Sequence, residues 1–263
     1  MSAYIYKAKT QILVELTYRF EVFATLLARY IQIVAVVFLW ECVYRYKSEL
    51  KGMTKEQMIT WIILATGLTI AYSTHVPSYI RNGVWQGNIA VDFLRPCSFM
   101  GMYLAQDIGS AITNVILRFV PTVVLGGISF HMLAPASLEN GLLCMVSVLA
   151  GYLIIWLLFA LIGVITFWAM ELGDMEWTLW TLISILSGNL IQIYFFPQSL
   201  QNVLAWLPFQ YTYQTPLALY IGKISWQEGL RQILVQLVWI VILAVGLKFL
   251  WTKMRKNILI QGG

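Results

Sequence analysis

Asp107, Asn114 and Arg118 place a carboxylate, an amide and a guanidinium within a long apolar stretch of the sequence. They are spaced by seven and four residues, so in an α-helix they fall within roughly 40° of one another on one face. A charge at membrane depth is costly and usually faces a bundle interior or an aqueous path. This face is therefore expected to line a substrate path or a subunit interface, or else to form a static contact that holds the helices together.

Two more pairs of polar side chains lie within apolar stretches, Arg29 with Gln32 and Asn189 with Gln192. They allow the same two interpretations, because hydrocarbon is an equally poor solvent for them. The sequence alone does not decide which face of each helix looks inward.

Motifs for catalysis or nucleotide hydrolysis are missing from the sequence. It has no Gly-rich phosphate-binding loop with Lys and Ser or Thr, no HExxH and no GxSxG. The two histidines and three isolated cysteines have no metal or redox spacing. Glu171, Asp174 and Glu176 could attract a cation, but a solvated turn that contacts a basic patch of a partner is favoured, since no further oxygen ligands converge there. We expect no catalytic residue and no metal site.

Composition indicates a membrane protein. Of the 263 residues, 60% are hydrophobic and 11% charged, whereas soluble domains are about 45–50% apolar and about 25% charged. The net charge of +5 is carried mostly at the ends of apolar segments, which suits orientation in a membrane. The sequence argues against nucleic-acid binding, because no basic stripe with interleaved aromatic residues occurs outside the apolar runs.

Six apolar segments approach the roughly 20 helical residues that span a bilayer. They cover residues 22–44, 57–75, 109–130, 141–170, 177–196 and 230–251. Residues 1–21 have an amphipathic period and are expected to lie in the membrane interface rather than to cross it. We therefore predict an all-α fold with six transmembrane helices in a single domain over residues 1–263.

The distribution of Lys and Arg favours a cytoplasmic N-terminus, and an even number of spans then places both termini in the cytoplasm. The bias is modest and depends mainly on the N-terminal helix and on Lys253–Lys256. The predicted location is the bacterial inner membrane.

Two connecting segments differ from ordinary loops. Residues 77–98 mix apolar and polar residues between prolines, which suggests a short docking helix with one face on the membrane domain and the other offered to a soluble partner. Residues 197–216 hold apolar pieces that are too short to span, interrupted by Pro197, Pro208 and Pro216. A short re-entrant or interfacial hairpin on the outer side is expected there, because broken helix at membrane depth must be enclosed by protein or water.

These features together resemble the permease subunits of type-2 ABC exporters, especially paired permeases with a separate ATPase. The resemblance covers essentially the whole chain and depends on the order and spacing of short motifs. These are the N-terminal helix, Arg81-Asn82-Gly83, Leu94-Arg95-Pro96, Ser187-Gly188 leading to Phe196-Pro197, and Leu207-Pro208-Phe209.

The resemblance implies a role for each segment. The coupling helix that docks on the ATPase would include Tyr79, Ile80, Arg81, Asn82, Gly83, Trp85, Asp92, Leu94, Arg95 and Pro96. Pro197 and Pro208 would belong to helices that close an external gate. ATP and Mg²⁺ would bind the ATPase partner and no cofactor would bind this chain, while a second permease, identical or homologous, would complete a pathway in the lipid. An amphipathic peptide, lipid or drug would then be exported by alternating access.

Two other classes of function remain open from the sequence. A membrane-embedded transferase would need acid, base or metal groups that converge at one interface, for which few residues are available. A channel or a secondary carrier is the other alternative, and a carrier would have repeated halves with matching broken helices. Only one broken segment is evident in the sequence.

Overall fold

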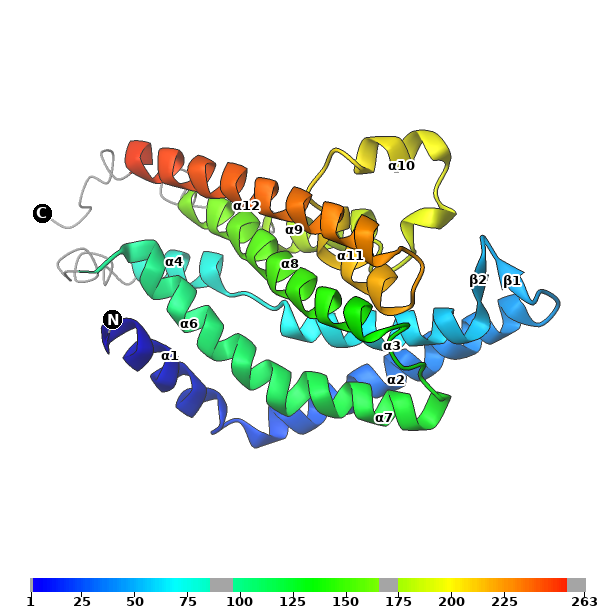
Figure 1. The fold of residues 1–263 in the computed structure, drawn as a ribbon. Helices are drawn as coiled ribbons and strands as arrows, with labels where there is room; N and C mark the ends of the chain where they lie inside the picture. The colour runs from blue at the N-terminus through cyan, green and yellow to red at the C-terminus, as the bar shows by residue number, and fades with distance from the viewer. Residues whose placement is uncertain (1, 86–96, 166–174, 255–263) are drawn as a thin grey trace, which may run out of the picture.

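The computed structural model of the protein describes residues 2–85, 97–165 and 175–254, most of which are helical (Figure 1). Five helices among them are long and apolar enough to cross a membrane: Phe20–Tyr44, Lys55–Gly83, Phe99–Phe130, Leu138–Ile165 and Trp226–Met254. The protein is therefore an all-α multi-pass membrane protein, as predicted.

Several of these long helices are interrupted. In chain order the elements are α1 (Ser2–Glu15), α2 (Arg19–Tyr44), β1 (Glu49–Leu50), β2 (Met53–Thr54), α3 (Lys55–Ala71), α4 (Val76–Trp85), α6 (Phe99–Asn114), the π-helix η1 (Val115–Phe119), α7 (Val120–Phe130), α8 (Leu138–Ile165), α9 (Met175–Leu186), the 3₁₀ helix η2 (Ile193–Phe195), α10 (Gln198–Leu204), α11 (Gln210–Tyr220) and α12 (Trp226–Met254). The two short strands form an antiparallel hairpin.

The segment expected as the fifth span is helical over a shorter stretch than predicted. The α9 helix has 12 residues, which at 1.5 Å per residue is about 18 Å, against a hydrocarbon core of about 30 Å. It stops at Leu186 because the chain turns at Ser187 and Gly188, and Gly188 has a φ of +83°. Residues 166–174, which precede α9, lie outside the described residues, so the count of six spans stays a prediction.

The two ends of the bundle are built differently (Figure 1). The start of α1, the helix α4 and the last turns of α8 and α12 gather at one end. The β1–β2 hairpin and α10 lie toward the opposite end. This arrangement is the one expected of an even number of crossings, with the beginning of α1 and the end of α12 on the same side. Which side is cytoplasmic stays a prediction.

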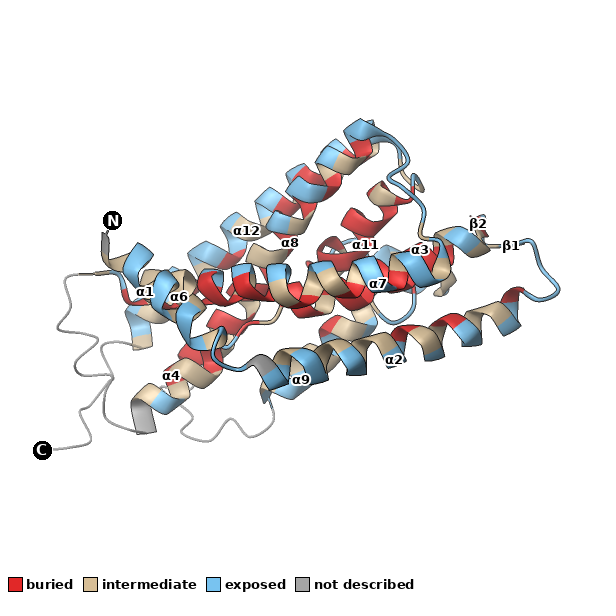
Figure 2. Ribbon diagram, turned by 90° about the horizontal axis from the view of Figure 1, so that it is seen from below, coloured by how far each residue is buried: buried red, intermediate tan, exposed pale blue. Residues whose placement is uncertain are grey.

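The centre of the bundle is formed by α3, α8 and α11 (Figure 2). Residues Tyr211 to Leu219 of α11 are all buried, and the buried Tyr72 side chain at the end of α3 donates hydrogen bonds to the carbonyls of Val148 and Thr212. By contrast, α2 exposes large apolar side chains such as Phe23, which suits contact with lipid or with another apolar surface.

The N-terminal helix α1 packs lengthwise against α6. Close approach is possible because Gly109 of α6 has no Cβ, and a Cβ there would lie 2.5 Å from the Ala8 carbonyl oxygen. Ile5, Leu13 and Val14 of α1 are exposed, so part of the apolar surface of this helix faces away from α6. The helix ends at Glu15, before the predicted boundary at residue 21, and its placement in the membrane interface stays a prediction.

Substituting Gly109 by valine should separate α1 from α6, because the new side chain would collide with backbone rather than with a movable side chain. We expect faster hydrogen–deuterium exchange over residues 2–15 in the purified variant. The matched control is Gly127→Val in α7, where the nearest atom to an added Cβ is 3.5 Å away. Equal exchange of α1 in the two variants would contradict this packing.

Candidate functional site

The break between α3 and α4 leaves backbone and side-chain polar groups of residues 72–75 inside the bundle, and α6 binds them. The fully buried Asp107 carboxylate accepts hydrogen bonds from the Thr74 hydroxyl at 2.6 Å and from the His75 backbone N–H at 3.3 Å. Two turns further along α6, the Asn114 amide donates to the Ser73 hydroxyl at 2.8 Å. Two side chains on one helix face therefore fix the interruption of another helix.

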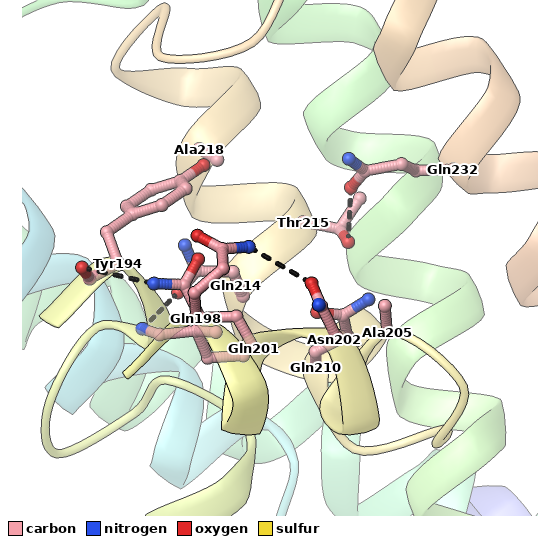
Figure 3. Close-up of a pocket in the computed structure, with 11 residues that line it drawn as sticks. Tyr194, Gln198, Gln201, Asn202, Ala205, Gln210, Gln214, Thr215, Ala218 and Gln232 are labelled. Carbon is pink, nitrogen blue, oxygen red and sulfur yellow. Dashed lines mark hydrogen bonds between the residues drawn. The ribbon is translucent and has the colours of Figure 1, made fainter. Parts of the chain in front are cut away.

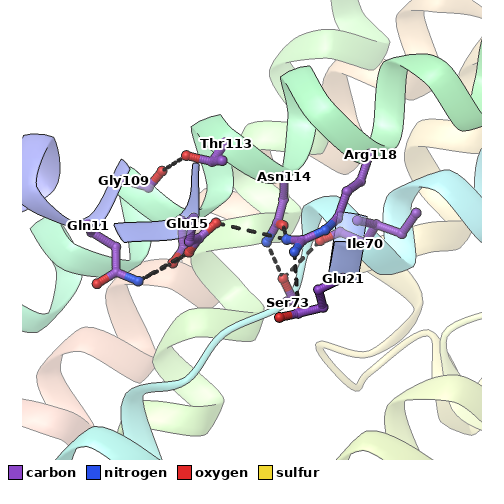
Figure 4. Close-up of polar contacts among 10 residues, drawn as sticks. Gln11, Glu15, Glu21, Ile70, Ser73, Gly109, Thr113, Asn114 and Arg118 are labelled. Atoms are coloured by element: carbon purple, nitrogen blue, oxygen red, sulfur yellow. Dashed lines mark hydrogen bonds and ion pairs between the residues drawn. The ribbon is translucent and has the colours of Figure 1, made fainter. Parts of the chain in front are cut away.

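Arg118 extends this polar face through the π-helix η1. Its guanidinium donates to the Asn114 amide oxygen, lies 3.3 Å from a Glu21 carboxylate oxygen and 3.9 Å from a Glu15 carboxylate oxygen (Figure 4). The Glu15 carboxylate also accepts from the Ser110 hydroxyl. Short π-helical segments within α-helices frequently occur at functional sites.

We call Glu15, Glu21, Ser73, Asn114 and Arg118 the polar junction, because they join α1, α2, η1 and the α3–α4 break. In the polar junction the carboxylates of Glu15 and Glu21 face the single guanidinium of Arg118. Arg118 is 8% exposed. Such a group of charges is stable only while each partner stays in place.

The polar junction lies at the beginning of the α2 span rather than at its middle. Glu21 is in the first turn of α2, and the 26 residues of this helix cover about 39 Å. A charge near the end of a span is less costly than one at the bilayer centre. The role expected for Asn114 and Arg118, in a substrate path, a subunit interface or a static contact between helices, stays a prediction.

The other two predicted pairs lie elsewhere. On α2, the half-buried Arg29 donates to the exposed Gln32 at 2.8 Å. Asn189 donates to the Thr69 hydroxyl of α3 at 3.2 Å, and the buried Gln192 amide lies 3.4 Å from the sulfur of Met58. Among the described contacts, neither pair bonds to the polar junction.

The helix α4 is held to the bundle by one face. Ile80 is fully buried and packs with Pro77 against Gly163 of α8, where an added Cβ would lie 2.8 Å from the Ile80 Cδ1 atom. The Tyr79 ring stacks on Tyr103 of α6 with 6.2 Å between centroids.

The remaining face of α4 is polar. The Arg81 guanidinium donates to the Ser78 hydroxyl at 3.4 Å, and that hydroxyl donates to Glu176 at the start of α9 at 3.0 Å. Asn82 is exposed and Gly83 is half-buried. The Trp85 side chain lies outside the described residues, together with Asp92, Leu94, Arg95, Pro96, Glu171 and Asp174.

Comparison with known families decides how this arrangement is classified. A family model described as ABC-2 family transporter protein matches residues 30–262. The chain belongs to the ABC-2 transporter family. Comparisons with curated proteins and with solved structures found no match. The resemblance drawn from the sequence is therefore confirmed at the level of the family.

Members of the ABC-2 family are membrane components of ABC transporters, are generally not catalytic and generally associate with an ABC ATPase subunit. In this ABC-2 protein the matched residues include Asp107, Asn114 and Arg118, whereas Glu15 and Glu21 precede them. Sequence reasoning missed both glutamates as partners of Arg118. Their positions in the sequence could have indicated this. Glu15 and Glu21 flank the start of an apolar span, and Arg118 lies within another apolar span, where it needs a counter-charge.

The predicted outer segment contains two short helices. Pro197 directly precedes α10, and Pro208 stands in the turn before α11. The α11 helix is buried among α3, α8 and α12, so the segment after Pro208 does enter the bundle, although its role as an external gate stays a prediction.

An amide-rich cavity beside these helices was not anticipated from the sequence, although glutamine and asparagine are unusually frequent between residues 189 and 214.

Proposed function

We propose that this ABC-2 protein is the permease subunit of an ATP-driven exporter in the bacterial inner membrane, with both termini cytoplasmic. A separate ATPase binds ATP and Mg²⁺, and a second permease, identical or homologous, completes the complex. The paired permeases expose an amphipathic substrate alternately to the two sides of the membrane. The observation that supports this most directly is the helix α4, which follows a helix break, packs by one apolar face and keeps a polar face outside.

The contacts of α4 suggest how movement of this helix would reach the spans. Asp107 binds the turn immediately before α4, and Asn114 binds the same turn one residue earlier. A displacement of α4 by a docked ATPase would therefore pull on α6 and, through Arg118, on the end of α1 and the start of α2. Movement of this kind needs two packed arrangements of similar free energy, which a broken helix allows more readily than a continuous one.

Co-purification with the ATPase tests this assignment. The chain is expressed with an affinity tag together with its neighbouring genes, and purified in a mild detergent. We expect ATPase activity to accompany the unaltered chain and to fall by about fivefold or more in the double variant Arg81→Ala/Asn82→Ala, because docking residues carry most of the affinity of an interface. Both side chains lie on the polar face of α4, so the fold should be retained.

The control is Tyr46→Ala, a change of an 88% exposed side chain beyond the far end of α2. It should recover as much ATPase as the unaltered chain. If the unaltered chain purifies without an ATPase and no neighbouring gene product hydrolyses ATP, the exporter assignment is wrong.

A further inference from the structure

A cavity of about 250 Å³ lies beside α10 and α11, at the opposite end of the bundle from α4 (Figure 3). Six of its eleven lining residues carry a carboxamide: Gln198, Gln201, Asn202, Gln210, Gln214 and Gln232. Gln198 and Asn202 on α10 are exposed, whereas Gln214 and Thr215 on α11 are buried. The cavity therefore has an accessible rim on α10 and a buried floor on α11.

The protein uses only part of the hydrogen-bonding capacity of these amides. Gln201 donates to the Phe196 carbonyl at 2.8 Å, and Gln198 donates to Asn202 at 3.0 Å. The Gln214 amide oxygen accepts from the Ile193 backbone N–H at 3.1 Å, but its amide nitrogen is buried and has no hydrogen-bond partner in the described structure. A carboxamide offers two N–H donors and an oxygen with two acceptor sites. Gln232 is engaged at both ends, since its oxygen accepts from the Thr215 hydroxyl at 2.8 Å and its nitrogen donates to Glu228 at 3.4 Å. The described contacts leave the Gln198 oxygen, the Asn202 nitrogen and both ends of the Gln210 amide available to a ligand.

The charge and size of the cavity limit what it can hold. None of the residues that line it carries a charge, so a charged ligand would lose water without gaining a counter-charge from the lining. A hydrocarbon group would leave the amides unpaired, at a cost for each buried donor or acceptor. The volume equals that of about eight water molecules at 30 Å³ each, which is below the usual range for drug-sized ligands.

We propose that this cavity binds a neutral sugar, because a sugar ring presents a hydroxyl on nearly every carbon atom and each hydroxyl can both donate to and accept from an amide. Tyr194 lines the same cavity, and the Lys223 ammonium lies over its ring at 5.5 Å from the centroid, so only the opposite face of the ring can pack against a sugar. The inference rests on the proposed transport function and names one part of the substrate. The sugar can come from a glycolipid head group or from a free saccharide.

Exposed apolar residues on α10 stand next to the cavity. Val203 is 57% exposed and Trp206, just after the helix, is 81% exposed. An alkyl chain attached to a bound sugar could cover this surface, as an amphipathic substrate requires.

Saturation-transfer NMR on the purified full chain in phosphatidylcholine nanodiscs tests this site. Octyl β-glucoside, octyl sulfate and octyltrimethylammonium share one alkyl chain and differ in head group, and methyl β-glucoside presents the sugar alone; each is used below its micelle concentration. We expect saturation of the sugar protons, with octyl β-glucoside bound more tightly than the two charged amphiphiles. Binding of octyl β-glucoside without methyl β-glucoside identifies a glycolipid as the source, and equal binding of both identifies a free saccharide.

The double variant Gln198→Ala/Asn202→Ala should weaken sugar binding by about fivefold or more, since it removes two amides from the exposed rim. The matched control is Gln227→Ala, an exposed glutamine of α12 that does not line the cavity. Equal binding of the three octyl compounds, or unchanged binding by the double variant, would overturn the inference. Binding is measured without an ATPase, so a chain that binds sugar but recruits no ATPase contradicts the proposed function alone.

Discussion

Replacing Arg118 by methionine should lower the free energy of unfolding by about 3 kcal/mol, because it leaves the largely buried Glu15 carboxylate without its counter-charge. The Arg118 side chain is 10% exposed and that of Glu15 is 15% exposed, so water does little to replace the lost guanidinium. Glu21 adds less to the effect, since its side chain is 66% exposed and its charge is screened. Asn114 also loses a hydrogen-bond donor to its amide oxygen.

Unfolding of the purified chain by increasing SDS in mixed micelles measures this effect. A double-mutant cycle with Glu15→Gln separates the charge interaction from the loss of packing. In the Glu15→Gln background, Arg118→Met should cost about half as much or less, because no buried carboxylate is then left unpaired.

Arg29→Met is the matched control, since it removes an arginine from the neighbouring helix α2 whose described hydrogen bond goes to the exposed Gln32. We expect a change within about 0.5 kcal/mol of the unaltered chain. If Arg118→Met and Arg29→Met were equally stable, the polar junction would not hold α1 and α2 to η1.

Substituting Gly188 by alanine should also cost about 3 kcal/mol, for a reason that concerns backbone geometry. Gly188 has a φ of +83°, which an L-residue adopts only with strain. An added Cβ would lie 2.4 Å from the Gln214 amide oxygen, and that oxygen is held by the Ile193 backbone N–H. Moving the amide aside would therefore break a buried hydrogen bond.

The control for this change is Gly246→Ala in α12. No atom lies within 4 Å of an added Cβ at Gly246, and alanine is favoured over glycine inside a helix by up to about 1 kcal/mol. In the same SDS titration the two Gly→Ala variants should therefore shift stability in opposite directions. A destabilisation of similar size in both variants would contradict the assigned role of the turn at Gly188.

Both predictions concern segments that contact α3. Its C-terminal break is bound by Asp107 and Asn114, and its middle is bound by the turn after α9, since the Trp61 indole N–H donates to the Gly188 carbonyl at 3.1 Å and Thr69 bonds to Asn189. The α3 helix thus connects the end of the bundle that carries α4 to the region of α10 and α11. A change at the break before α4 should therefore alter the contacts of α3 with the turn after α9, and the reverse, because α3 is a buried and continuous helix between them.

The amino-acid sequence by itself determined that this protein is a membrane protein with an all-α fold, and it determined the family. Composition and the length of apolar runs are local properties, so they predicted the positions of the long helices. The helical period also placed Asp107 near Asn114, and both side chains bind the break between α3 and α4. Arg118 lies in the π-helix η1, to which the regular α-helical period does not apply.

Only the tertiary structure decided which groups meet that face. Glu15, Glu21 and Ser73 come from three other segments, and no local period relates them to Arg118. The second span was predicted to end at residue 75 and the fifth at residue 196, whereas α3 ends at Ala71 and α9 at Leu186. The sequence places these ends too late because it remains apolar beyond each turn. The cavity beside α10 likewise needed side chains from four separate helical segments, η2, α10, α11 and α12.

The physical reason is that hydropathy carries less information about orientation in lipid than in water. In a soluble protein an apolar side chain points to the core, whereas in a membrane it can face either lipid or another helix. The rotation of each helix about its axis is then set by close packing, as at Gly109 and Gly163, and by the few polar groups that must find partners. Those two terms depend on the whole bundle, and the sequence determines the helices but not their mutual rotation.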